Sequence, residues 1–90
     1  MNTASSVVLP KATVLAMTKF ILAAKFRSTS EEIAMIFELQ LRTTQNTNAD
    51  VDLTVEQQKL ILDILNNPTL EVSGTQREEL AGYRTSLSQA

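Results

Sequence analysis

The chain has 90 residues and a net charge of −2, and it contains neither cysteine nor histidine. This length is that of one small domain, disulfides are excluded, and the usual zinc ligands and imidazole bases are missing. Because glycine, proline and aromatic residues are few and helix-forming residues are many, we predict an all-α fold. The expected domain spans residues 1–90 and packs an N-terminal helical hairpin with two shorter C-terminal helices.

The chain is expected to begin with an arm, residues 1–9, whose last three residues are apolar. Pro10 suits the position just ahead of a helix, and the apolar spacing predicts that helix over residues 11–27. Its apolar residues fall on two sides, so it should be buried from two directions. The first side consists of Val14, Met17, Phe20, Ile21 and Ala24. The second side consists of Leu15, Leu22 and Phe26.

The clearest boundary in the chain follows, at residues 28–32. Ser28 with Glu31, and Thr29 with Glu32, both match the S/T-x-x-E capping box, which predicts a helix over residues 30–44. The short connection makes the first two helices an antiparallel hairpin. Apolar residues surround much of the second helix. We expect its main core face to be Ile33, Ala34, Phe37 and Leu41, with Met35, Ile36 and Leu39 extending the apolar area.

Residues 43–53 form the only long polar stretch and are predicted to be a loop. Asn46, Asn48, Asp50, Asp52 and Thr54 alternate oxygen-bearing side chains, as the first part of an EF-hand calcium loop does. Val51 stands where that loop requires glycine, and the bidentate glutamate is replaced by glutamine. A solvated loop without calcium is therefore the preferred interpretation.

Two further helices are predicted over residues 55–67 and 76–87. Thr54 with Gln57, and Thr75 with Glu78, supply the capping boxes. The core face of the third helix is Leu60, Ile61, Ile64 and Leu65, and that of the fourth is Leu80, Tyr83 and Leu87.

Residues 53–65, followed by Asn67-Pro68 and residues 76–81, resemble the opening of a MarR-type winged helix. That resemblance implies a DNA-binding regulator with a recognition helix and a wing further along the chain. Arg84 is the only base after Glu79, and residues 31–90 carry four bases and all ten acids, for a net charge of −6. This sign is wrong for a phosphate backbone, so we do not expect nucleic acid as a partner.

Residues 1–30 carry four bases and no acid, which is typical of targeting peptides and of helices that lie on anionic membranes. Lys11 and Lys19 interrupt the apolar run, however, and residues 12–24 are too short to span a bilayer. We therefore interpret the segment as part of the fold, expect no membrane as a partner, and expect a cytoplasmic protein. A membrane-surface protein that uses this basic helix remains an alternative.

No combination of residues predicts a catalytic, cofactor or metal site. Glu31 with Glu32, and Glu78 with Glu79, are fully explained as acids in the first turns of helices. We therefore predict a non-enzymatic protein–protein interaction module, a small helical regulator, adaptor or inhibitor that acts as a homodimer without a cofactor. The alternative is a DNA-binding regulator with a degenerate helix-turn-helix. The expected protein interface consists of Leu15, Lys19, Leu22, Phe26, Met35 and Leu39.

Overall fold

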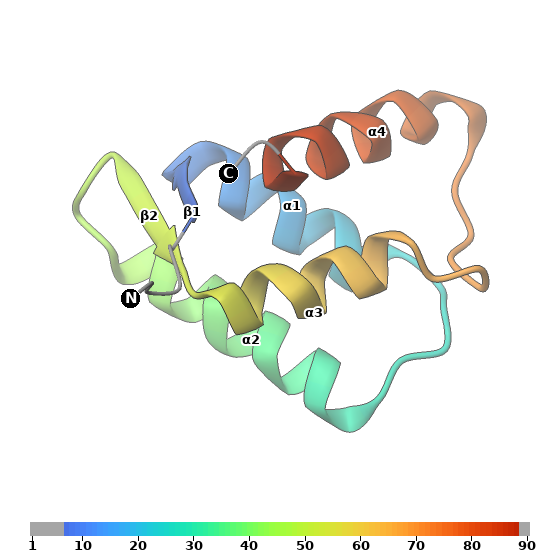
Figure 1. Ribbon diagram of the computed structural model, residues 1–90, viewed down its shortest axis with the longest axis horizontal. Coiled ribbons are helices and arrows are strands. Elements are labelled where there is room, and N and C mark those ends of the chain that lie inside the picture. Colours follow the sequence, from blue (N-terminus) through green and yellow to red (C-terminus); the bar gives the residue numbers. More distant parts are fainter. Residues whose placement is uncertain (1–6, 89–90) are drawn as a thin grey trace, which may run out of the picture.

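In the computed structural model, residues 7–88 are described, and they form four helices and one two-stranded antiparallel sheet. The helices are α1 (Lys11–Ala23), α2 (Ser30–Gln45), α3 (Val55–Leu65) and α4 (Gly74–Ser88), and the strands are β1 (Val7–Pro10) and β2 (Asp50–Leu53) (Figure 1). The four predicted helices are confirmed, whereas the strictly all-α prediction is wrong because of the sheet. Of the predicted N-terminal arm, residues 1–6 lie outside the described residues, and the rest is β1.

The sheet includes the end of the segment that the sequence predicts to be a polar loop. Val7 pairs with Leu53 and Leu9 with Val51, and the side chains of all four are buried. Asp52 alternates with them and is exposed. This two-residue alternation is what a half-buried strand requires. The EF-hand interpretation does not fit, because residues 50–53 are an extended strand rather than a coiled loop.

The core lies between the helices and the inner face of the sheet. Both α2 and α3 begin with the predicted capping boxes, because Thr29 accepts from the Glu32 N–H at 3.0 Å and Thr54 accepts from the Gln57 N–H at 3.0 Å. The fourth helix begins two residues earlier than predicted, with Ser73 and Gln76 as the cap pair. The fully buried core side chains include Val14, Met17, Ile21, Ile36, Leu39, Leu53, Ile61, Ile64, Leu65 and Leu87.

The two connections between helices lie side by side at the end of the molecule opposite the sheet (Figure 1). The Glu71 N–H donates to the Lys25 carbonyl at 2.9 Å, and the Arg27 N–H donates to Thr69 Oγ1 at 2.8 Å. Asn67 Nδ2 also donates to the Arg27 carbonyl at 2.7 Å. These bonds use residues 25–27 in extended form, which explains why α1 ends at Ala23 and not at Arg27 as predicted.

Side-chain hydrogen bonds also join the C-terminal part of α4 to the two ends of α3. Gln58 Nε2 donates to the Leu87 carbonyl at 2.6 Å. At the other end, Arg84 Nη2 donates to the Leu65 carbonyl at 2.6 Å, which satisfies one of the last carbonyls of α3. The predicted stripe of Leu80, Tyr83 and Leu87 is buried, as expected.

Candidate protein-binding surface

The second helix presents its apolar side chains in two opposite directions. Ile36, Leu39 and Thr43 face the core and are buried. On the opposite side, Phe37 is 56% exposed and Leu41 is 61% exposed. Large apolar side chains open to solvent to this extent, on one face of one helix, are the feature of the molecule that most needs a functional explanation.

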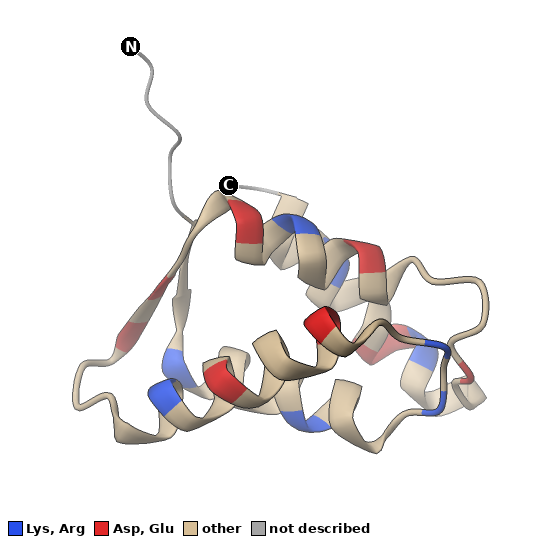
Figure 2. Ribbon diagram, turned by 90° about the horizontal axis from the view of Figure 1, so that it is seen from below, with Lys and Arg blue, Asp and Glu red and all other residues tan. Residues whose placement is uncertain are grey.

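The helical repeat brings these residues into one stripe. Residues four apart lie one turn apart on the same face, so half-buried Ile33 lies one turn before Phe37 and Leu41 one turn after it. Exposed Ala34 lies beside them. We refer to Ile33, Ala34, Phe37 and Leu41 as the α2 stripe. The charged residues of α2 are Glu31, Glu32, Glu38 and Arg42, so both signs of charge lie on this helix outside the stripe, and Figure 2 shows both signs along the helices.

The α2 stripe is the set of residues that the sequence analysis assigns to the core, and that assignment is wrong. Apolar residues occur almost all the way round α2, so spacing alone does not determine which side turns inward. The contacts with α1 and α3 place Ile36, Leu39 and Thr43 in the interior instead.

The six residues of the predicted interface do not form one open patch. Leu39 is fully buried within the chain, so its inclusion is corrected: it has no surface to offer a partner. Leu22, Phe26 and Met35 are half-buried and pack against the core. The remaining members differ from one another, since Leu15 is half-buried and Lys19 is exposed.

The predicted interface residues therefore contribute at most partial surface, and the open apolar area lies on the α2 stripe, whose residues the interface prediction does not include. The available signal was the excess of apolar residues around α2. Val8, on the outer side of β1, is the other large apolar side chain exposed among residues 7–88, at 56%.

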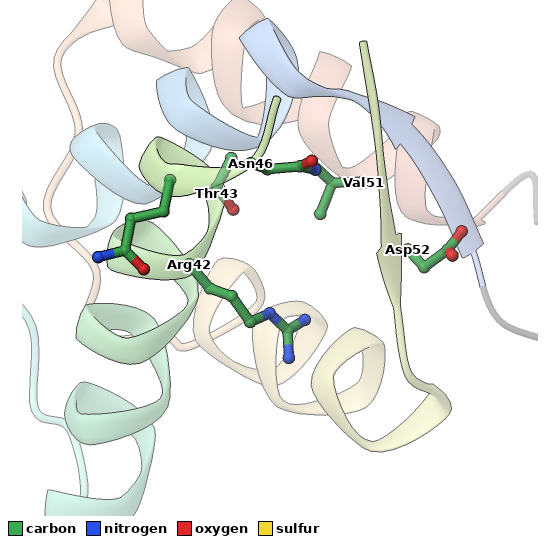
Figure 3. A pocket seen from close by; sticks show the side chains of 6 residues that line it. Arg42, Thr43, Asn46, Val51 and Asp52 are labelled. Atoms are coloured by element: carbon green, nitrogen blue, oxygen red, sulfur yellow. The ribbon is translucent and has the colours of Figure 1, made fainter. Parts of the chain in front are cut away.

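A hollow lies on another side of α2, next to β2. Its lining residues are Arg42, Thr43, Gln45, Asn46, Val51 and Asp52 (Figure 3). Within residues 7–88, no three carboxylate, histidine or cysteine side chains gather into a group that could hold a metal ion. None of the helices in that range is long and apolar enough to cross a bilayer.

Comparison with protein-family models, with curated proteins and with solved structures finds no match.

Proposed function

We propose that this protein is a non-enzymatic protein–protein interaction module, a small helical regulator or adaptor, and that it self-associates as a homodimer through the α2 stripe. The observation that supports the proposal is the exposure of Phe37 and Leu41 on one face of α2. Covering these side chains removes apolar area from water, which favours association by about 25 cal/mol per Å².

The stripe is suited to a second copy of itself. Phe37 has an aliphatic residue one turn away on either side, Ile33 in one direction and Leu41 in the other. A two-fold axis at Phe37 would run the two α2 helices antiparallel. It would set Phe37 against its counterpart and Ile33 against Leu41 of the other copy. Symmetric interfaces of this self-complementary kind are the commonest in homodimers.

The size of the stripe limits the expected affinity. A stable interface buries about 800 Å² per partner, whereas a helix of 16 residues is about 24 Å long and offers one face. Association must also offset the loss of translational and rotational freedom. We therefore expect a weak dimer, with a Kd on the order of 10 μM.

Cysteine cross-linking tests both the interface and its register. The chain has no native cysteine, so Ile33→Cys and Leu41→Cys each introduce a single thiol. In the antiparallel arrangement, position 33 of one copy faces position 41 of the other. An equimolar mixture of the two variants should therefore form a disulfide-linked heterodimer under mild oxidation.

Each variant alone provides the matched control. With the axis at Phe37, two copies of position 33 are about 12 Å apart along the helix, since each residue rises about 1.5 Å. A disulfide requires Cα atoms within about 7 Å, so each variant alone should cross-link much more slowly than the mixture. Equal rates in the mixture and in the separate variants would contradict the proposed interface.

A further inference from the structure

The hollow beside the C-terminal end of α2 has a volume of about 380 Å³ and is open to solvent on one side. This volume is within the range of small-molecule sites. The hollow lies between α2 and β2 (Figure 3), on a different side of α2 from the stripe. A ligand in the hollow therefore does not require a partner on the α2 stripe.

The hydroxyl of Thr43 is the unusual group in this hollow. Thr43 is 1% exposed, and its Oγ1 has no hydrogen-bond partner within the part of the chain that the structure describes. Leaving a buried hydroxyl unpaired is unfavourable, and most such groups in folded proteins are paired. In Figure 3 this hydroxyl lies on the side of α2 that faces the hollow.

The charges around the hollow favour an anion. The guanidinium of Arg42 extends from α2 into the same space (Figure 3). A second cation is close by, because Lys11 Nζ donates to the Asn46 carbonyl at 2.6 Å. The carboxylate of Asp52 lies on the other side of β2, away from Arg42 (Figure 3).

The opposite wall of the hollow is apolar. Val51 is buried on the inner face of β2 and lines the hollow across from α2. Asn46 is occupied by the loop itself, because its Nδ2 donates to the Asp50 carbonyl and its Oδ1 accepts from the Asn48 N–H. The groups left to recognise a ligand are thus the guanidinium of Arg42, the side-chain amide of Gln45, the hydroxyl of Thr43 and the aliphatic surface of Val51.

We propose that this hollow binds a small organic anion, a molecule with one carboxylate or phosphate group and a short aliphatic part. Arg42 donates to the oxyanion in the charge-assisted manner typical of guanidinium groups, and Thr43 Oγ1 donates a second hydrogen bond. The aliphatic part of the ligand lies against Val51. This site is independent of the proposed dimer and goes beyond protein binding.

Titrations followed by NMR of the amide and guanidinium nitrogens test the proposal, with acetate, butyrate and inorganic phosphate as probes. Sodium chloride at the same ionic strength serves as the reference. We expect saturable shifts at Arg42 and Thr43 with at least one probe. A tighter Kd for butyrate than for acetate would indicate a carboxylate with an aliphatic part, and saturation by phosphate alone would indicate a phosphate group.

Two substitutions and one control sharpen the test. Arg42→Gln should weaken the binding at least tenfold, whereas Arg77→Gln, at an exposed position on α4, should leave it unchanged. Thr43→Val removes the hydroxyl at nearly constant volume. This variant should weaken the binding several-fold. The thermal unfolding midpoint of the unliganded protein should stay unchanged or rise, because the substitution removes an unpaired buried hydroxyl.

Shifts that do not saturate with any probe would overturn the proposal, and so would binding that Arg42→Gln leaves intact. A lower unfolding midpoint for Thr43→Val together with unchanged binding would also overturn it, because the hydroxyl would then be paired within its own helix. Arg42 is exposed, so the first of these variants keeps the fold and gives a readout in every case.

Discussion

At the scale of single residues, Tyr83 joins the core to a surface carboxylate. Its ring meets that of Phe20 edge to face, with centroids 5.5 Å apart and an interplanar angle of 73°. Aromatic pairs in this geometry contribute about 0.5–1.5 kcal/mol beyond the area they bury. The hydroxyl donates to Glu79 one turn earlier on α4. Phe20 and Tyr83 therefore link α1 to the helix with the narrowest apolar stripe.

The environment of Tyr83 predicts its titration. Burial, the hydrogen bond to Glu79 and the negative charge of Glu79 all raise the pKa of this phenol above its ordinary value of about 10. The pKa of Tyr83 is higher in the folded than in the unfolded state. The contribution of Tyr83 to the free energy of unfolding is therefore complete below about pH 10. It is lost as the pH rises through the folded-state pKa.

Absorbance at 295 nm during a pH titration measures this ionisation directly, since Tyr83 is the only tyrosine. We expect a midpoint clearly above pH 10, and a lower midpoint in Glu79→Gln that still exceeds the ordinary value because the ring stays buried. A midpoint near pH 10 in a protein that circular dichroism shows to be folded would contradict this account.

Single residues also show which burial the apolar spacing of the sequence can predict. The burial of Leu80, Tyr83 and Leu87 is correctly predicted, because α4 has one narrow apolar stripe and only one way to bury it. The exposure of Phe37 and Leu41 is not predicted, because α2 has apolar residues on both sides. Periodicity identifies a face only where the opposite face is polar.

At the scale of elements, side-chain caps hold the starts of α2, α3 and α4. In α3, Thr54 Oγ1 accepts from the Gln57 N–H, and Gln57 Oε1 accepts in return from the Thr54 N–H at 2.9 Å. Thr29 and Glu32 form the same reciprocal pair in α2, with the returned bond at 2.9 Å. These caps satisfy backbone N–H groups that have no partner inside the helix.

Removal of a cap should have a measurable cost. We expect Thr54→Ala and Thr29→Ala each to lower the free energy of unfolding by about 1 kcal/mol, as measured by urea denaturation. Thr47→Ala, at an exposed threonine in the loop between α2 and β2, is the matched control and should change it by less than about 0.5 kcal/mol. Losses no larger than that of the control would show that the caps do not hold the helices.

The sheet is the element that sequence reasoning missed. Asn and Asp are frequent in residues 46–52, and these residue types favour turns over strands. The signal that could have found β2 is the alternation Asp50-Val51-Asp52-Leu53, which places both apolar residues on one side. The paired residues of β1 lie 40–46 positions earlier, and no local pattern specifies that pairing. Val7 and Leu9 supply the matching apolar residues.

At the scale of the whole molecule, backbone pairing joins segments distant in sequence at each of the two ends of the fold. The β1–β2 sheet joins residues 7–10 to residues 50–53, and the Lys25–Glu71 bridge joins the two helix connections at the other end. The four helices between them cover a core that includes one side of α2. The other side of α2, which carries the α2 stripe, has no covering element within the described residues.

Sedimentation equilibrium of the protein and two lysine variants, from about 1 to 200 μM, tests whether the α2 stripe mediates self-association. Phe37 and Val8 have the same exposure, 56%, so Val8→Lys is the matched control for Phe37→Lys. We predict that the unmodified protein and Val8→Lys shift from monomer to dimer across this range, whereas Phe37→Lys stays monomeric and folded. A monomer at every concentration for the unmodified protein, or a dimer that Phe37→Lys leaves intact, would contradict self-association through the α2 stripe.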